Sequence, residues 1–428
     1  MKARLTDKWI YIIAVLNSFF LITKFGVDIE PDTPSYINAW DQSWSIGVID
    51  SFRTPIYPCI LGLIKTIFSS QYLLVTIIFQ HIVFLISIYY LQRILSWKVK
   101  SSSTVKWLTL IYALLPATST WANCILTESL AISGTIFLFY NLFAFQQNNR
   151  ISNVIWVSIW LLILVMLRPS FLYLFPAAII AWLIYYRSSK KHVIIGIIGV
   201  CIVGFIEFLY FSAYKEKYGL FGPSSVGTIN QTYIAIQNGF INPSYTNNPD
   251  LSHDIANFTD QHKQQYSTTG KIEFNETWEF VHYLFNKYDI GDINDLIKSS
   301  QKTLSKDWMN NIISRLVDSF NEPLLRANNG PVRIKLFFAI NMNLLYIFLI
   351  INTIVLTCRT YKTRLLFKTS IILLITVLGN LFTIIIGAQD AWGRLFLPSL
   401  PLILIMIGQA FNYIKFDFNG TTKETDIE

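Results

Sequence analysis

The sequence predicts an all-α polytopic membrane protein with about ten transmembrane helices and one extracytoplasmic loop domain. Hydrophobic residues make up 53% of the 428 positions and charged residues only 14%, whereas soluble domains carry about 25% charged residues. The apolar residues form separate blocks of roughly 17 to 24, the length that an α-helix needs to cross about 30 Å of hydrocarbon. Transmembrane barrels show short alternating segments instead, so the pattern favours a helical bundle.

Ten apolar blocks are expected to be membrane spans, and they divide the chain into four parts. The expected spans are 9–27, 71–93, 105–121, 124–146, 151–168, 170–187, 192–214, 335–357, 365–387 and 393–414. The parts are an N-terminal transmembrane module at 1–214, a cap at 215–334, C-terminal transmembrane helices at 335–416 and a tail at 417–428. We expect a small helical cap whose first half is irregular, and Gly222-Pro223 and Asn242-Pro243 indicate turns.

Lysine and arginine residues in short connections indicate the orientation. The connections 94–106, 187–191 and 358–364 are rich in these residues, and such loops stay in the cytoplasm. The rule predicts a multi-pass protein with both termini and the tail in the cytoplasm. The first loop, 28–70, and the cap then lie outside.

One apolar segment in the first loop, 54–68, is too short for a confident span and contains two prolines and Lys65. Counted as a span, it would reverse every later connection and place the basic ones outside. We therefore interpret it as an interfacial or re-entrant helix.

The unusual polar residues of this apolar chain gather in the predicted outer connections. They are Asp28, Glu30, Asp32, Tyr36, Arg53 and Tyr57 in the first loop, Glu128 at the fourth span, Arg168 after the fifth, and Asp390 and Arg394 before the last. Ionisable residues at the edge of a membrane core are costly and indicate a functional site. Their convergence from four connections predicts one site on the extracytoplasmic face.

The residue types in these connections suggest acid–base chemistry on a phosphate. A carboxylate at the membrane surface can act as general base on an acceptor hydroxyl. A guanidinium matches a phosphate with two parallel hydrogen bonds. With apolar surface below, the pattern suggests a lipid-linked phosphate substrate whose tail stays among the membrane lipids. Nucleic acid is not an expected partner, because the net charge of +8 comes from residues in short loops.

Several motifs resemble C-type glycosyltransferases, the GT-C superfamily. Asp32 with Tyr36 four residues later, followed by R-T-P-I-Y-P from Arg53, is similar to their first outer loop. More narrowly, the chain resembles the bacterial branch of the protein mannosyltransferase and aminoarabinose transferase family, glycosyltransferase family 39. Thr127-Glu128, R-P-S from Arg168 and A-Q-D-A-W-G-R-L-F-L-P are also similar to that branch. The resemblance covers the membrane part and leaves out the cap.

The resemblance implies a GT-C-like fold and an inverting transfer of a sugar from a polyprenyl-phosphate donor to an acceptor hydroxyl. The acceptor would be a lipid, a polysaccharide or a protein. An aspartate of the first outer loop would be the base, and basic residues would hold the donor phosphate. The family often shows Asp-Glu where this chain has Asp32-Thr33, with Asp28 and Glu30 upstream. Asp32 is the first candidate base because Tyr36 follows it at the family's spacing, and Asp28 is the second. The bacterial branch also implies a bacterial inner (plasma) membrane.

These arguments assign the candidate residues to three roles. The catalytic candidates are Asp32 and Asp28; the donor-phosphate ligands are Arg53, Arg168 and Arg394; the substrate-binding residues are Glu30, Tyr36, Tyr57, Glu128 and Asp390. No cofactor and no metal are expected, although an acid pair could hold a divalent ion. The four cysteines show neither metal spacing nor evident pairing, and we expect them to be buried.

Two other functions fit parts of the pattern. An O-antigen polymerase or ligase also has many spans and outer arginines, but the early Asp32–Tyr36 motif argues against it. A polytopic transporter or lipid flippase would need intramembrane charge along a path, broken helices and internal repeats. His81 and Glu207 lie within spans and could form a proton relay, yet most charges gather at one surface.

Overall fold

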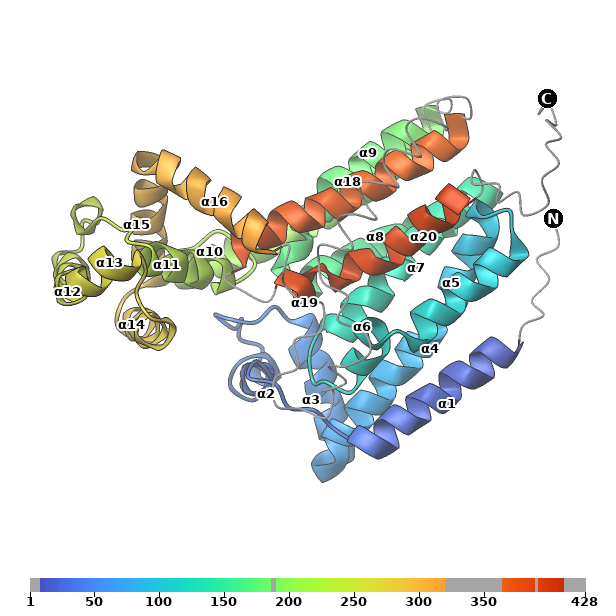
Figure 1. Ribbon diagram of the computed structural model, residues 1–428, viewed down its shortest axis with the longest axis horizontal. Coiled ribbons are helices and arrows are strands. Elements are labelled where there is room, and N and C mark those ends of the chain that lie inside the picture. Colours follow the sequence, from blue (N-terminus) through green and yellow to red (C-terminus); the bar gives the residue numbers. More distant parts are fainter. Residues whose placement is uncertain (1–7, 186–189, 320–363, 389–391, 412–428) are drawn as a thin grey trace.

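The computed structural model describes residues 8–185, 190–319, 364–388 and 392–411. These residues form α-helices and short 3-10 turns, and within them the only β-type pairing is an isolated bridge between Asp28 and Cys124. Figure 1 shows a bundle of long helices with a group of shorter helices at one end. The described chain is therefore all-α, as the sequence predicted.

Two groups of helices form the bundle. The first group is α1 (Lys8–Phe25), α2 (Thr33–Gln42), α3 (Ile56–Phe68), α4 (Tyr72–Lys98), α5 (Ser102–Leu114), α6 (Pro116–Ser119), α7 (Glu128–Asn148), α8 (Ile151–Leu167), α9 (Leu174–Tyr185) and α10 (Lys190–Tyr218). The second group is α18 (Arg364–Gly387), α19 (Trp392–Phe396) and α20 (Leu400–Phe411).

Six helical segments are long and apolar enough to cross a membrane. They are Lys8–Phe25, Ile56–Lys98, Glu128–Asn148, Lys190–Tyr218, Lys368–Gly387 and Gly393–Phe411, and Ile151–Leu167 and Pro169–Ile184 are shorter apolar helices. These segments confirm a multi-pass helical membrane protein. The count of ten spans stays a prediction, because the expected span 335–357 lies outside the described residues.

Burial distinguishes central from peripheral helices. In α7, 94% of the membrane-length window is buried, whereas the corresponding share is 22% in both α1 and α10. The outer helices expose large apolar side chains such as Phe19 and Phe205, which in a soluble protein would form an unfavourable patch. The bundle is thus built around α7, with apolar faces on the outside where hydrocarbon would contact them.

The expected span 105–121 is wrong as one continuous helix. Helix α5 ends at Leu114, and Pro116 opens the separate short helix α6. Leu115 takes an extended conformation, with φ −62° and ψ 122°, as expected for a residue whose α conformation the next proline disfavours. The chain then runs irregularly to Glu128, so the following span begins later than the expected residue 124.

The segment 54–68 is helical, as expected, in the form of α3. A 3-10 turn at Ser69–Gln71, with Ser69 at φ 46°, links it to α4. Helix α3 packs against both α2 and α4. Its interfacial or re-entrant position stays a prediction.

The cap is helical and has its own core. It comprises α11 (Val226–Gln237), α12 (Pro249–Gln261), α13 (Lys263–Thr269), α14 (Phe274–Lys287), α15 (Ile290–Thr303) and α16 (Ser305–Ser319). Its buried side chains form a cluster separate from that of the bundle. The predicted turns are present around Pro223 and Pro243, but the expectation of an irregular first half is wrong, because α11, α12 and α13 lie there. The boundaries 215 and 334 stay predictions.

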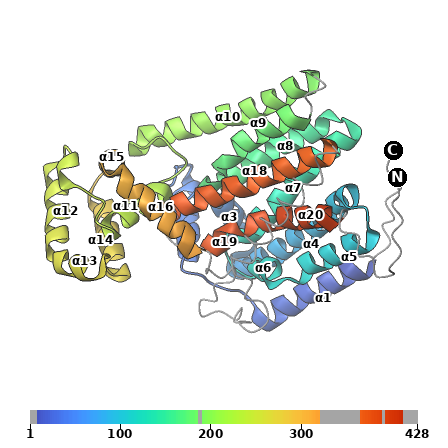
Figure 2. The same cartoon turned by 45° about the horizontal axis from the view of Figure 1, so that its top comes forward.

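The cap lies at one end of the bundle, as Figures 1 and 2 both show. Two contacts attach α11 to the end of α18: Asn230 Nδ2 donates to the Gly387 carbonyl at 3.0 Å, and Gln231 Nε2 donates to the Ile386 carbonyl at 2.7 Å. The Ser225 N–H also donates to the Ser51 carbonyl at 2.9 Å. These bonds hold the cap against the connections that carry the candidate site residues.

Packing between α2 and α3 depends on Gly62, and we expect Gly62→Ala to destabilise the protein. A Cβ atom there would lie 1.8 Å from Cδ2 of Trp40, so the indole would have to move. Such overpacking costs about 1–3 kcal/mol, which outweighs the helix propensity gained from alanine. The melting temperature in detergent should fall by several degrees. Gly227→Ala in α11, whose Cβ would meet no atom within 4 Å, is the matched control and should not lower it.

Candidate active site

The site begins at the start of α2. Asp32 immediately precedes the helix, and proline in its first turn favours a helix start there. The Asp32 side chain makes no capping hydrogen bond, which leaves both carboxylate oxygens available. Ser35 and Tyr36 follow three and four residues later, so they lie on the same helical face as Asp32.

Two arginines share the Asp32 carboxylate. Arg53 Nη2 lies 2.9 Å from Oδ1, and Arg394 Nη2 lies 2.9 Å from Oδ2. Burial alone would raise the pKa of Asp32, but the charges and hydrogen bonds of the two guanidinium groups outweigh it and lower the pKa to about 2. Asp32 is therefore fully ionised in this arrangement.

Arg53 is fixed by several groups of the first loop. Its Nε donates to Ser35 Oγ at 2.8 Å, and its Nη1 donates to the Tyr36 hydroxyl at 3.2 Å. The guanidinium carbon lies 4.1 Å from the centre of the Tyr36 ring, in cation–π geometry. The backbone N–H of Arg53 donates to Asp50 Oδ1 at 2.6 Å. The orientation of Arg53 is thus set from both its side chain and its backbone.

Glu128 joins the other two arginines. Its Oε1 lies 3.2 Å from Arg394 Nε and 3.5 Å from Arg168 Nη2. Glu128 is the first residue of α7 and is 1% exposed, a position where the helix macrodipole favours a negative charge. Arg168 adopts an extended conformation between α8 and a 3-10 turn that starts at Pro169, as expected for a residue before proline.

These charged groups border a cavity of about 440 Å³. That volume lies within the usual range for small-molecule sites, about 300–1,000 Å³. Its charged and phenolic lining is Asp32, Tyr36, Arg53, Glu128, Arg168 and Arg394, and its apolar lining includes Leu126, Leu167, Leu172, Ile229, Ile384 and Leu395. The cap contributes Asn230 and Trp278. The cavity therefore combines a charged region with apolar walls.

The other candidate residues lie elsewhere. Tyr57 is fully buried, its ring packs edge-on against Tyr36 at 4.9 Å, and its hydroxyl donates to Gln80 Oε1 at 2.9 Å. Tyr57 thus supports Tyr36 from behind and is not among the residues that line the cavity. Asp390 lies outside the described residues.

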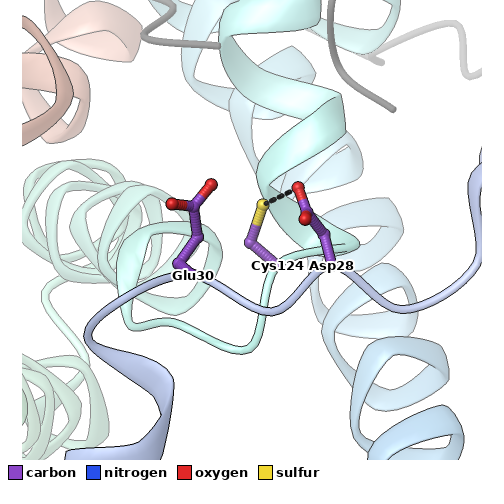
Figure 3. A group of neighbouring side chains, drawn as sticks. All are labelled: Asp28, Glu30 and Cys124. Carbon is purple, nitrogen blue, oxygen red and sulfur yellow. Dashed lines mark hydrogen bonds between the residues drawn. The ribbon is translucent and has the colours of Figure 1, made fainter. Parts of the chain in front are cut away.

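Asp28 and Glu30 also lie outside the cavity lining. The Asp28 N–H donates to the Asn123 carbonyl at 2.9 Å, and its carbonyl accepts from the Ile125 N–H at 3.1 Å. Figure 3 shows the Asp28 and Glu30 side chains beside Cys124, whose thiol donates to Asp28 Oδ2 at 3.4 Å. Burial raises the pKa of Asp28, and burial together with repulsion from Asp28 raises the pKa of Glu30.

The structure adds supporting residues that the sequence analysis missed. Gln80 Nε2 donates to the carbonyls of Ala122 and Cys124, at 3.1 and 2.7 Å. Asn123 Nδ2 donates to the Leu21 and Gly26 carbonyls, at 3.1 and 2.7 Å. These amides hold the irregular chain before Glu128. A glutamine in the middle of an apolar span is the signal that could have identified Gln80.

Ser35 and Asp50, the two groups that orient Arg53, were also missed. Ser35 could have been found from its spacing, because it lies one helical turn after Asp32 and beside Tyr36. Trp278 and Asn230 of the cap gave no signal in the sequence. They approach the site only through the folding of the cap against α18.

Comparison with known proteins identifies the fold. No family model and no curated protein match this sequence. In structure, the chain is similar to the oligosaccharyltransferase of Archaeoglobus fulgidus in the apo form, with a TM-score of 0.51 and 12% identity over 94% of this chain and 50% of that one. The same enzyme tethered to an acceptor peptide gives a TM-score of 0.52 and 12% identity, over 95% and 50%.

A weaker likeness links the chain to ArnT from Cupriavidus metallidurans bound to undecaprenyl phosphate. The TM-score is 0.40 with 10% identity, over 95% of this chain and 77% of that one. The likeness to the oligosaccharyltransferase confirms the GT-C fold expected from the sequence. The chain spans about half the length of that enzyme.

The depressed pKa of Asp32 makes part of the stability pH-dependent. An aspartate whose pKa falls from 3.8 to about 2 on folding stabilises the protein above pH 3.8, and this contribution is lost as the pH falls towards 2. The melting temperature of wild type should exceed that of Asp32→Asn at neutral pH, and the difference should shrink below about pH 4. Other titrating groups are common to both proteins and cancel. A difference that stays constant down to about pH 3 would contradict the ion pairs.

Proposed function

We propose that the chain is a membrane glycosyltransferase that moves a sugar from a polyprenyl-phosphate donor to an acceptor hydroxyl, with inversion at the anomeric carbon. The observation that carries the proposal is the cavity in which Asp32 lies between Arg53 and Arg394 beside apolar walls. Use of the same fold by an oligosaccharyltransferase supports the class of reaction.

The charges of the cavity fit a phosphate. Three arginines and two carboxylates line it, which leaves one net positive charge. Guanidinium groups bind phosphate oxygens in bidentate geometry, and the charge-assisted hydrogen bonds are stronger than neutral ones. The apolar side chains of Leu126, Leu167 and Ile384 border the same space and would accept the first isoprene units of the lipid.

The proposed reaction assigns one role to each group. The donor phosphate binds Arg53 and Arg394, and it competes with Asp32 for their hydrogen bonds. Asp32 then takes the proton of the acceptor hydroxyl as the oxygen attacks the anomeric carbon. The bond from that carbon to the phosphate oxygen breaks, and its electron pair leaves with the lipid phosphate. The arginines stabilise the negative charge that grows on this leaving group.

Glu128 is proposed to position the arginines. It is almost fully buried and holds Arg168 and Arg394 by one oxygen. The Arg394 guanidinium thereby lies between the Asp32 and Glu128 carboxylates, where a bound cation would otherwise bridge them. We therefore propose that the transfer step uses no cofactor.

The proposal places the site on the extracytoplasmic face of a bacterial inner membrane, with both termini in the cytoplasm. The lysine- and arginine-rich connections 94–106 and 187–191 support it, because short loops rich in these residues stay in the cytoplasm. The acceptor class stays open among lipids, polysaccharides and proteins.

The described residues give little support to a proton-coupled transporter. His81 Nε2 lies 3.0 Å from Asn123 Oδ1, a residue that holds the loop before Glu128. Both carboxylate oxygens of Glu207 are buried, with no hydrogen-bond partner within the described parts of the chain. His81 and Glu207 therefore do not belong to a common chain of hydrogen bonds.

Replacing the proposed base tests the function. Asp32→Asn should lower the rate of sugar transfer from a labelled polyprenyl-phosphate donor in proteoliposomes by roughly 10²- to 10⁴-fold, the contribution typical of a general base. Asp41→Asn is the matched control. Asp41 lies on the same helix and also pairs with a cation, Lys65 at 2.6 Å, but it does not line the cavity. Its rate should stay at the wild-type level.

Two outcomes would overturn the assignment. Full transfer by Asp32→Asn would move the role of base to another residue. Absence of transfer by wild type with every donor tested, together with movement of labelled lipid across the bilayer, would favour the transporter or flippase.

Replacing a proposed phosphate ligand tests donor binding separately from chemistry. Arg53→Gln should weaken binding of polyprenyl phosphate roughly ten- to 150-fold, because hydrogen bonds to charged groups contribute about 1.5–3 kcal/mol. Arg150→Gln is the control, since Arg150 is exposed and precedes α8 at the end opposite Arg168. Equal affinities of the two variants, measured by fluorescence competition in nanodiscs, would exclude Arg53 as a phosphate ligand.

A further inference from the structure

Extended backbone brings two acids and a thiol together beside the cavity. In an extended segment, alternate side chains point to the same side, which places Asp28 and Glu30 on one face. The bridge to Cys124 adds a third side chain to this face. Figure 3 shows all three projecting to the same side of the paired segments, with the thiol between the two carboxylates.

The three side chains are close together and shielded from solvent. One carboxylate oxygen from each acid and the Cys124 sulfur all lie within 4.8 Å of one another. The exposed fractions are 7% for Asp28, 7% for Glu30 and 3% for Cys124. This is the only group of at least three such potential ligands in the described part of the chain.

Glu30 supplies an independent reason to expect a ligand. Across the described residues its carboxylate forms neither a hydrogen bond nor an ion pair, although only 7% of the residue is exposed. Burying an ionised carboxylate without compensation is costly. Its backbone is fixed, because the N–H donates to Thr33 Oγ1 at 3.0 Å and the carbonyl accepts from the Thr33 N–H. The carboxylate is therefore held towards the cluster without a partner.

The positive charge near these acids is already paired, although Arg394 attracts the Glu30 carboxylate electrostatically. Arg53 and Arg394 are engaged with Asp32, and Arg168 is engaged with Glu128. The carboxylate oxygen of Glu128 that does not pair with an arginine, Oε2, is buried and has no hydrogen-bond partner in the described residues. A cation between Asp28 and Glu30 would compensate charge that the nearby side chains leave unbalanced.

We propose that Asp28, Glu30 and Cys124 bind a divalent metal ion of the zinc class. Zinc accepts carboxylate oxygens at about 2.0 Å and cysteine sulfur at about 2.3 Å in tetrahedral geometry, which places sulfur and oxygen ligands about 3.5 Å apart. The observed distance from Cys124 Sγ to Asp28 Oδ2 is 3.4 Å. A thiolate ligand disfavours magnesium and calcium, which prefer oxygen. The fourth ligand is water.

The metal has a positioning role in this proposal. Asp28 and Glu30 precede Asp32, and Cys124 precedes Glu128, so the ion would fasten the two segments that carry the acids of the cavity. Binding converts the Cys124 thiol to a thiolate and releases its proton to solvent. The ion takes no part in bond breaking. Its presence is therefore independent of whether the chain transfers sugars.

Metal binding to the full-length protein in detergent tests the proposal directly. After bound metal has been removed with a chelator and zinc has been added, wild type should bind about one zinc per chain. The zinc that elutes with the protein on gel filtration is measured by elemental mass spectrometry. Cys124→Ala should take up almost none. Cys59→Ala is the matched control, because Cys59 lies in α3 outside the cluster, and it should bind like wild type.

Cobalt supplies a second readout that keeps Cys124 in place. A chain in which Cys59, Cys201 and Cys358 are replaced by alanine keeps Cys124 as its single cysteine, and addition of Co²⁺ should produce a thiolate-to-cobalt charge-transfer band. Absence of this band in the folded variant, or equal zinc in wild type and folded Cys124→Ala, would overturn the proposal. The acids would then be compensated by bound protons.

Discussion

The sharing of the Asp32 carboxylate between two arginines is the interaction on which the site depends. It joins α2 to Arg394, 362 positions later in the chain. Arg394 continues to Glu128, and Glu128 to Arg168, so opposite charges alternate across the cavity from Arg53 to Arg168. Buried ion pairs contribute little net stability but are costly to break. This series of ion pairs is therefore better explained by the proposed binding of a phosphate than by a need for stability.

Polar side chains within the membrane part support this arrangement. The chain between Pro116 and Glu128 leaves regular helix, and its buried backbone groups need hydrogen-bond partners. Gln80 donates to two of its carbonyls, and Tyr57 anchors Gln80 from α3. Asn123 ties the same stretch to the carbonyls of Leu21 and Gly26. Polar side chains within a membrane span often indicate a transport path. Here they instead hold the loop that leads to Glu128.

The sequence predicts what local patterns encode. Apolar blocks identified the membrane helices, and arginines beside apolar ends identified Arg53, Arg168 and Arg394 as one group. The difference between Asp28 and Asp32 was not predictable, because it comes from the contact of Asp28 with Cys124, 96 positions away. That contact leaves no periodic signal. The break at Pro116 was encoded locally, but the apolar content of 105–121 concealed it.

The low pKa of Asp32 is at first sight unfavourable for its proposed role as base, since a carboxylate of pKa about 2 is a weak proton acceptor. The conflict disappears because the groups that lower the pKa are the proposed phosphate ligands. When a phosphate occupies Arg53 and Arg394, Asp32 loses hydrogen bonds and shares their charge with a second anion, so its pKa rises. In the proposed reaction, Asp32 therefore becomes an effective base only after the donor has bound. An acceptor or water that arrives first would meet a weak base, so the proposed reaction couples proton removal to the presence of the sugar donor.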